Sequence, residues 1–419
     1  MTKLVVWRDD RRVGVLDTAL NGEVRFTYDA DVVADGDRRY AVGVRCPVRT
    51  RPYVGPDAEA VFENLLPEGN LRRALGQATK HDVSDTVGLL GVVAGDCAGA
   101  LHLWPEGVEP PEKASHEPCV AATMHAAFTG AAGQLRQAVG RTSLSGAQPK
   151  LALWRMPPVG GVAPEYQLPR NGAPTTVVVK RADNNFPGVL EAELVGMRLM
   201  QAAGVPTASS SRCAVASDCH ETARFDREVR DDGHVRRLHA EDGCQVTGRA
   251  SRAKYAGMGA PTYQELVAIL ERWSANPLED RENLYRWAVA NAAMGNYDGH
   301  AKNLSVVYVA PDQVRLSPAY DVVVTAAYEH LDKTLALSFG GTTLPQALTT
   351  ASVAVAAREF RLPRDRAVEL AAGVVTNVRE ALADVLSAVR ADGGDQQMLE
   401  RCDASVQRTS ADLTKRLGL

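Results

Sequence analysis

Residues 291–303, NAAMGNYDGHAKN, are the stretch around which the rest of the chain is organised. An apolar run with helical periodicity, LYRWAVANAAMG, leads into it and predicts a buried helix. We expect this helix to end at Gly295 and to deliver the compact polar loop NYDGHAKN. A rigid helix that places a dense polar loop is typical of a functional site, because reacting groups must be held in position.

The spacing inside the loop indicates a particular chemistry. Asp298 and Asn303 have the D-x-x-x-x-N spacing of protein-kinase catalytic loops, in which the Asp accepts the proton of the attacking hydroxyl and the Asn binds a metal ion. Farther on, Asp321 in SPAYDVVV would supply a second metal ligand. Mg²⁺ prefers oxygen ligands and is usually held by one or two carboxylates plus substrate phosphates. The alternative is that Asp298 and Asn303 only cap and turn the loop.

Two earlier features are typical of a nucleotide-binding lobe. The loop SLSGAQPK, residues 143–150, precedes an apolar strand, and its small residues would let backbone N–H groups approach phosphates. The β-branched strand TVVVK ends in Lys180, the kinase arrangement for a lysine that holds phosphates, and the following helix offers Glu191 or Glu193 as its partner. Taken singly, the loop also reads as an ordinary hairpin loop, and Lys180 also reads as a solvated strand end.

Composition excludes several broad classes. With 419 residues, 45 % hydrophobic and 23 % charged, the chain reads as an ordinary globular protein, and its net charge of −4 argues against electrostatic nucleic-acid binding by the chain as a whole. The seven cysteines include no C-x-x-C pair, which favours free thiols in a reducing compartment. No signal peptide and no apolar run of about twenty residues occurs, so we expect a soluble, cytoplasmic protein with no membrane association.

The pattern along the chain predicts three domains. Residues 1–107 read as a β-rich module with embedded helices, beginning with a hairpin around residues 8–11 and ending at the linker EGVEPPEKASHEP. Residues 120–225 contain a short helix near 121–139, the phosphate loop and the Lys180 strand. Residues 226–419 are mainly helical, with NLSVVYVA and QVRLSPAYDVVV predicted as strands around a turn at Pro311 and Asp312.

With these residues in view, the chain resembles the HipA family of serine/threonine-kinase toxins of Hip toxin–antitoxin modules. The segments that carry the resemblance are SLSGAQPK, VVVK, ARFDR, EDGCQ, NYDGHAKN and AYDV, in the family's order. The resemblance implies an α+β fold: a small β-rich N-terminal subdomain on a two-lobed protein-kinase-like core, with a helical C-terminal lobe. It also implies ATP and Mg²⁺ as cofactors.

The resemblance assigns roles to individual residues. Asp298 would be the catalytic base, Asn303 and Asp321 would bind magnesium, and Lys180 would hold the nucleotide phosphates. One departure is Pro149, which stands where the family often has Glu and removes an N–H donor from the loop. The residues implied to contact the nucleotide are those of the phosphate loop, Ser145, Gly146, Ala147, Gln148, Pro149 and Lys150; those of the adenine hinge, Ala223, Arg224 and Phe225; and His300, Ala301, Lys302, Asn303, Tyr320 and Asp321.

The resemblance further implies regulation and partners. Autophosphorylation would fall on Ser143, or alternatively Ser145, and would shut the kinase off, because a phosphate of about −2 charge cannot share the loop with ATP phosphates. The expected substrate is an aminoacyl-tRNA synthetase, and the expected partner is a HipB-like helix-turn-helix antitoxin. Operator DNA would be bound mainly through the antitoxin, because TTLPQALTT lacks lysines. The alternatives are a small-molecule or lipid kinase, and a regulatory corepressor module that acts with the antitoxin.

Overall fold

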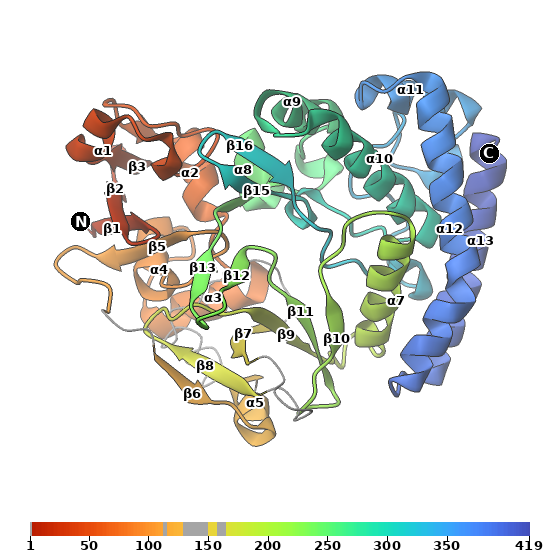
Figure 1. Ribbon diagram of the computed structural model, residues 1–419, viewed down its shortest axis with the longest axis horizontal. Helices are drawn as coiled ribbons and strands as arrows, with labels where there is room; N and C mark the ends of the chain where they lie inside the picture. The colour runs from red at the N-terminus through yellow and green to blue at the C-terminus, as the bar shows by residue number, and fades with distance from the viewer. Residues whose placement is uncertain (1, 112–114, 129–149, 157–164) are drawn as a thin grey trace. The chain divides into compact units, whose positions relative to one another are not determined.

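The computed structural model describes residues 2–111, 115–128, 150–156 and 165–419. They belong to two compact units, which are described separately (Figure 1). The first unit comprises Met1–Arg181, Arg212–Ser251 and Val307–Asp312, and the second comprises Ala182–Ser211, Arg252–Val306 and Gln313–Leu419.

The first unit begins with a five-stranded antiparallel sheet of order β4-β3-β2-β1-β5. Arg8 pairs with Arg11, so the predicted hairpin is confirmed. Leu4, Phe26 and Phe62 are fully buried between the sheet and its helices. The elements are β1 (Leu4–Arg8), β2 (Arg11–Thr18), β3 (Val24–Tyr28), α1 (Ala30–Asp35), η1 (Arg38–Tyr40), β4 (Tyr53–Val54), α2 (Pro56–Glu63), α3 (Gly69–Thr79), α4 (Thr86–Val93) and β5 (Leu101–Pro105).

A second sheet of the first unit has the order β10-β11-β9-β7-β8-β6. Its apolar face is covered by α5, with Met124 buried against Leu153 and Val179. The predicted strand that ends at Lys180 is confirmed as β9. The elements are β6 (Ser115–Pro118), α5 (Ala121–Phe128), β7 (Lys150–Arg155), β8 (Tyr166–Arg170), β9 (Val177–Arg181), β10 (Ser210–Arg212) and β11 (Cys219–Ala223).

Short elements complete the first unit. β12 and β13 form a hairpin, and β14 is hydrogen-bonded to β15. Within β15 the chain passes from the second unit, which includes Val306, to the first, which includes Val307. Asp242 and Gln245 form a capping box that starts α8, which accounts for the EDGCQ segment. The elements are β12 (Arg227–Val229), β13 (Val235–Arg237), β14 (Ala240–Asp242), α8 (Gly243–Thr247), η2 (Ser251–Ala253) and β15 (Ser305–Ala310).

The second unit is mainly helical, as predicted. α10 packs against α12 and α13, and α7 also packs against α12. Aromatic rings of Tyr263, Tyr285, Phe339 and Phe360 form one buried cluster. The elements are α7 (Val189–Ala202), η3 (Ala256–Met258), α9 (Tyr263–Trp273), α10 (Pro277–Met294), η4 (Ala301–Asn303), β16 (Gln313–Leu316), η5 (Thr325–Ala327), η6 (Pro345–Ala347), α11 (Thr350–Glu359), α12 (Arg364–Ala391) and α13 (Gln396–Leu417).

The helix predicted to lead into the polar loop is α10. Its start is set by Asn276, whose side chain accepts the N–H of Glu279, and by Pro277 in the first turn. Its end is Gly295, which has φ of +72° and donates its N–H to the carbonyl of Asn291. A side chain at position 295 would also meet Ala326, since an added Cβ would lie 2.4 Å from the Ala326 Cβ. Glycine is therefore required at this position for two independent reasons.

One strand prediction is wrong. QVRLSPAYDVVV was expected to be extended throughout, but β16 ends at Leu316. Pro318 lacks an N–H for strand pairing, and Asp321 has φ of +56°, which an extended strand does not allow. Val322 and Val324 are buried without belonging to a strand. The β-branched run therefore reflects burial, not sheet formation.

The three-domain division stays a prediction. The first compact unit combines most of residues 1–107 and 120–225 with residues 226–251, whereas residues 182–211, including α7, cluster with the second unit. Of the helix predicted near 121–139, the part that can be compared is α5, residues 121–128.

Candidate active site

The loop that follows α10 is held by two asparagines. The Nδ2 of Asn296 donates to the Oδ1 of Asn291 at 2.8 Å, and the Oδ1 of Asn296 accepts the N–H of Asp298 at 3.2 Å. Both asparagines are buried. Asn296 thus links the last turn of α10 to the backbone of Asp298, which gives the loop a defined exit from the helix.

Asp298 is the exposed residue of this loop. Its Oδ1 accepts a hydrogen bond from the Tyr255 Oη at 2.7 Å, and its main-chain carbonyl accepts the N–H of His300 at 2.8 Å. An ionised carboxylate that is open to solvent and held by its neighbours can accept a proton from an incoming hydroxyl group. The geometry therefore suits Asp298 to the predicted role of base.

Asn303 links the predicted base to the other predicted metal ligand. Its Nδ2 donates to the carbonyl of Asp298 at 3.3 Å and to the carbonyl of Asp321 at 3.1 Å. Neither bond uses Oδ1, the atom that a metal ion would take. Asp321 has φ of +56°, a conformation that is uncommon for a non-glycine residue and that concentrates at functional sites.

The donor set fits magnesium in part. The residues described contain no group of three His, Cys, Asp or Glu side chains arranged to hold a metal ion. Mg²⁺ does not need such a group, because phosphates and waters usually complete its six oxygen ligands. An amide oxygen from Asn303 and a carboxylate from Asp321 are the hard donors that this ion prefers, so these residues fit the predicted role.

Tyr320 supports the loop instead of standing apart from it. Its Oη donates to the carbonyl of Lys302 at 2.6 Å and lies 2.6 Å from the Oγ of Ser305. Ala301 and Lys302 are buried within the one-turn helix η4. The contacts of Tyr320 therefore place it as a brace for the predicted nucleotide-binding segment.

His300 is held in its neutral form. Burial lowers the pKa of His300 to about 3, with Lys254 and Lys302 acting in the same direction and Asp321 opposing them. Its Nδ1 has no hydrogen-bond partner among the residues that the structure describes. A buried polar atom of this kind is costly unless something pairs with it, so the ring is equipped to bond a ligand.

Sequence reasoning missed the segment that contains Lys254 and Tyr255. The carbonyl of Lys254 accepts the N–H of Ala301 at 3.1 Å, and the Tyr255 ring stands edge-on to His300 with centroids 5.2 Å apart. AKYAGMG has no periodicity and no known spacing, so its approach to a loop more than forty residues away could not be read from the sequence.

In the first unit, basic side chains form a row across three strands. Lys180 on β9 is directly opposite Lys150 on β7 and directly opposite His220 on β11. Directly paired residues lie on the same face of a sheet, with Cβ atoms roughly 5 Å apart. All three are buried, and the two lysine charges placed so close favour an anion beside them. His220 is an addition that the sequence did not indicate.

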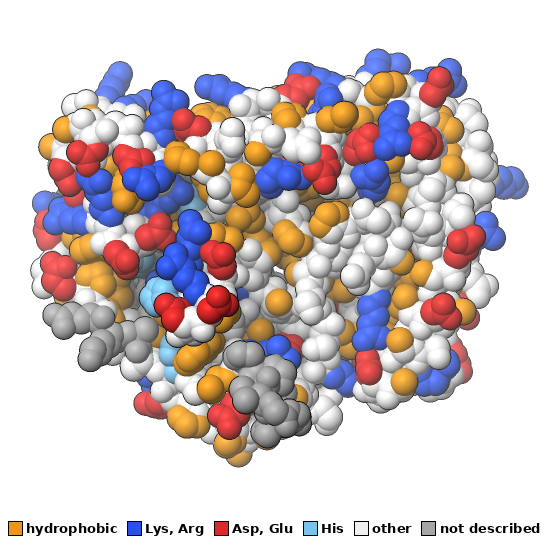
Figure 2. All heavy atoms as spheres, in the orientation of Figure 1, with side chains coloured by type: hydrophobic (Ala, Val, Ile, Leu, Met, Phe, Trp, Pro, Cys, Tyr) orange, Lys and Arg blue, Asp and Glu red, His pale blue; other side chains and the backbone are white. Residues whose placement is uncertain are grey.

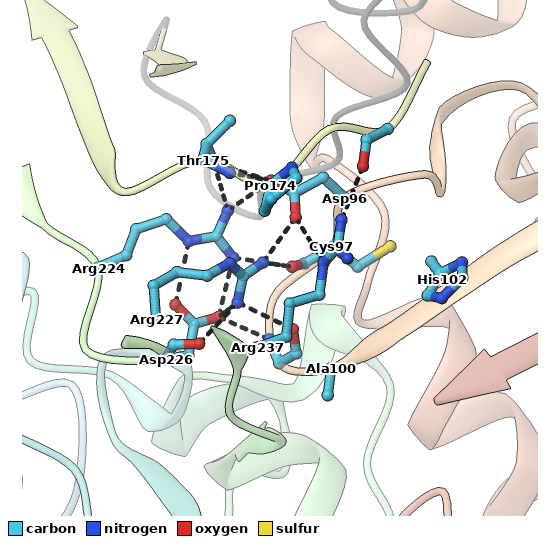
Figure 3. A network of polar contacts seen from close by, with 12 residues as sticks. Asp96, Cys97, Ala100, His102, Pro174, Thr175, Arg224, Asp226, Arg227 and Arg237 are labelled. Atoms are coloured by element: carbon cyan, nitrogen blue, oxygen red, sulfur yellow. Dashed lines mark hydrogen bonds and ion pairs between the residues drawn. The ribbon is translucent and has the colours of Figure 1, made fainter. Parts of the chain in front are cut away.

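In the predicted hinge, the Arg224 side chain takes part in a buried ion network. The backbone N–H of Arg224 bonds the carbonyl of Thr176, but its side chain is buried in an ion network with Asp96 and Asp226 (Figure 3). Ala223 is exposed and Phe225 is partly buried. The hinge role of residues 223–225 stays a prediction, and Arg224 would serve it through its backbone.

The predicted phosphate loop lies outside the described residues except for Lys150. This applies to Ser143 and to Ser145, Gly146, Ala147, Gln148 and Pro149, so their assigned roles stay predictions.

Comparison with known proteins decides the family. The model of the HipA-like C-terminal domain matches residues 142–382, more than half of the chain, and the model of the HipA N-terminal domain matches residues 4–104. The chain belongs to the HipA family. The predicted resemblance is confirmed.

Individual HipA relatives agree. The protein Y4mE of Sinorhizobium fredii, named as a candidate kinase, is 33 % identical over 348 residues, which cover 80 % of this chain and 80 % of that protein. The serine/threonine-protein kinase toxin HipA of Shewanella oneidensis is 25 % identical over 340 residues, covering 77 % and 76 %. These relatives place the chain among HipA-like kinases.

The fold prediction is also confirmed. A chain in the solved complex of Shewanella oneidensis MR-1 HipA, HipB and operator DNA superposes with a TM-score of 0.81 at 21 % identity, covering 99 % of this chain and 98 % of that one. The α+β, protein-kinase-like HipA fold is therefore shared. Among the described residues, each helix is too short or too polar to cross a lipid bilayer.

Proposed function

We propose that the protein is an ATP- and magnesium-dependent serine/threonine-protein kinase of the HipA toxin type. The single observation that carries the proposal is the Asn303 side chain, which bonds the carbonyls of both Asp298 and Asp321. One side chain thereby ties the backbone of the proposed base to the backbone of the proposed metal ligand. An ordinary loop cap has no need of the second contact.

Each residue has a role in this proposal. Asp298 orients the acceptor hydroxyl and takes its proton, while Lys150 and Lys180 hold the nucleotide phosphates. Asn303 and Asp321 would hold Mg²⁺, which supplies charge neutralisation on the phosphate oxygens when bound. Neutral His300, with Lys302 and Tyr320 behind it, would border the nucleotide. Positioning and electrostatics are the main contributions that a protein makes to phosphoryl transfer.

Regulation and partners follow from the family. We propose autophosphorylation on Ser143, or on Ser145, as the reaction that inactivates the kinase. We also propose an aminoacyl-tRNA synthetase as the substrate and a HipB-like helix-turn-helix antitoxin as the partner. The name of the Shewanella HipA relative supports the acceptor class, and its solved complex with HipB and operator DNA supports the antitoxin.

DNA binding is proposed to be mainly the antitoxin's task. On the face in Figure 2, Lys and Arg side chains lie intermixed with Asp and Glu side chains. Over the whole sequence, 47 basic residues stand against 51 acidic ones. A phosphate backbone attracts a protein through an excess of positive charge, which this composition does not provide.

The test is intact-mass and peptide mass spectrometry after incubation with ATP and Mg²⁺. We compare the wild type with Asp298→Asn and with Asp384→Asn, a control on the exposed side of α12. A phosphoryl group on Ser143 or Ser145 of the wild type and the control, missing from Asp298→Asn, would support the proposal. Transfer by a folded Asp298→Asn protein would refute the assigned base. ATP binding without transfer, with purified synthetases also unmodified, would favour the corepressor alternative.

A further inference from the structure

Tyr255 approaches the catalytic loop from a segment that no family motif in the sequence includes. Its Oη lies 2.7 Å from the Asp298 Oδ1, within the range of a charge-assisted hydrogen bond. The phenol is the donor, because an ionised carboxylate can only accept. One oxygen of the proposed base is therefore already engaged before any acceptor arrives.

The backbone that carries this phenol is itself held by hydrogen bonds. The carbonyl of Tyr255 accepts the N–H groups of Met258 and Ala260, at 2.8 and 3.2 Å, which closes a tight turn. The next residue, Ala256, donates its N–H to the carbonyl of Ala336 at 2.8 Å. A side chain on such an anchored turn can orient another side chain, because its own position costs little further ordering.

The same segment also holds the other end of the loop. The Lys254 carbonyl accepts the N–H of Ala301, and the Tyr255 ring packs edge-on against His300. Residues 254 and 255 therefore contact the loop at three places: the proposed base Asp298, His300 and the one-turn helix η4. A residue that served packing alone would not need its hydroxyl on the carboxylate.

We propose that Tyr255 is a positioning residue that turns the Asp298 carboxylate toward the acceptor hydroxyl. With Oδ1 bonded to the phenol, rotation of the carboxylate about its side-chain bonds is restricted. Tyr255 does not exchange a proton in this scheme, and no bond to it is made or broken. The inference rests on the proposed kinase function, which it deepens by naming how the base is held.

The variant that isolates the hydroxyl is Tyr255→Phe, which keeps the ring beside His300. Tyr328→Phe is the matched control, since it removes a phenol that bonds the carbonyl of Pro187, which is not a residue of the loop, at 3.0 Å. Losing a hydrogen bond to a charged group corresponds to a rate loss of about tenfold or more. We expect kcat to fall by about tenfold in Tyr255→Phe, with the KM for ATP and the melting temperature unchanged, and no change in Tyr328→Phe.

A second measurement does not depend on turnover. In protein carrying ¹³C at the aspartate carboxyl groups, the Asp298 signal is identified by its loss in Asp298→Asn. At one fixed pH this signal should move in Tyr255→Phe and stay in place in Tyr328→Phe. Both variants leave the neighbouring charged groups Lys254, Lys302 and Asp321 unchanged, so a movement of the signal reports the loss of the phenol.

The two measurements separate the possible failures. Wild-type protein that transfers no phosphate would remove the proposed function, while the carboxyl signal still decides whether Tyr255 holds Asp298. An unmoved signal in Tyr255→Phe overturns the inference. So does an unchanged kcat, or a fall in kcat that comes with a matching loss of ATP affinity or of thermal stability.

Discussion

Replacing Asp96 with Asn should lower the stability of the first unit more than any change of a surface charge does. Asp96 is 0 % exposed, and its carboxylate accepts from Arg224, Arg227 and Arg237 at 2.8 to 3.2 Å. The N–H and hydroxyl of Thr175 complete its bonds, at 3.2 and 2.7 Å (Figure 3). Asn has nearly the same shape but no charge, and its amide nitrogen puts a donor where Asp96 has an acceptor, so the substitution removes the charge and part of the hydrogen bonding.

The expected loss of stability follows from the arginine charges that stay buried in the variant. In the wild type all three arginines pair with Asp96, and two of them, Arg224 and Arg227, also pair with Asp226. The variant keeps the pairs with Asp226 but removes a carboxylate from all three arginines. Removing one partner of a buried ion pair costs about 3–5 kcal/mol, because the remaining charges stay desolvated. This is a large fraction of the roughly 5–15 kcal/mol that keeps a domain folded.

The measurement is urea unfolding followed by circular dichroism, with hydrogen exchange on peptides from β5 and β12 to assign the loss to the first unit. A cost of this size lowers the midpoint by about 1–2 M urea. The control is Glu228→Gln, which breaks an exposed pair with Arg236 and should cost less than about 1 kcal/mol. Equal midpoints for the two variants would refute the reasoning, since the network would then contribute no more than a surface contact.

The pH dependence of the same network has a defined sign. Burial alone would raise the pKa of Asp96, but Arg227, Arg224 and Arg237 hold it well below its ordinary value. A carboxyl group with a depressed pKa stabilises the fold above its unfolded pKa of about 4, and the stabilisation is lost as the pH falls through the folded pKa. The gap between wild type and Asp96→Asn should therefore be constant near neutral pH and narrow only below about pH 4.

Two further predictions concern the loop that follows α10. Gly295→Ala should lower stability by about 2–5 kcal/mol, because it adds strain at φ of +72° to a clash with Ala326. The control is Gly393→Ala, which has φ of +83° but open space and should cost only about 1–2 kcal/mol. Equal melting temperatures for the two variants would contradict this prediction. Since the pKa of His300 is lowered to about 3, the unfolded chain binds one more proton there between roughly pH 4 and 6, so stability falls on acidification. His300→Asn should flatten that slope by about one proton in urea titrations, and parallel slopes would count against a buried neutral imidazole.

Local patterns in the sequence were sufficient for several elements of the fold. The hairpin at residues 8–11, the strand ending at Lys180 and the helix ending at Gly295 each have a periodicity and a stop signal within a few residues. The strand predicted through Asp321 was wrong, because the same β-branched residues are used to fill a buried coil. Hydrophobicity reports burial, and it does not by itself report whether the backbone is extended.

What could not be predicted depends on contacts between distant segments. Asp96 meets Arg224 across 128 residues, and Tyr255 meets Asp298 across 43. The row of Lys150, Lys180 and His220 depends on strand register, which no single strand specifies. Within ARFDR, the resemblance pointed to a nucleotide hinge, yet the Arg224, Asp226 and Arg227 side chains bind each other and the segment around Asp96. The motif's charged residues thus have a structural use that its position in a family pattern does not reveal.

The D-x-x-x-x-N spacing has a geometric origin in this loop. After Asp298, the chain turns at Gly299 and forms the single turn η4, and this turn returns Asn303 to the Asp298 carbonyl. A Cβ at position 299 would lie 2.9 Å from the Asn291 Nδ2, so a larger residue there would require the buried Asn291 side chain to shift. One residue more or less in the turn would rotate the Asn303 side chain away from both carbonyls that it bonds. The spacing therefore sets the separation of the proposed base, Asp298, from the proposed metal ligand, Asn303, and the carbonyl of Asp321 accepts the second hydrogen bond of Asn303.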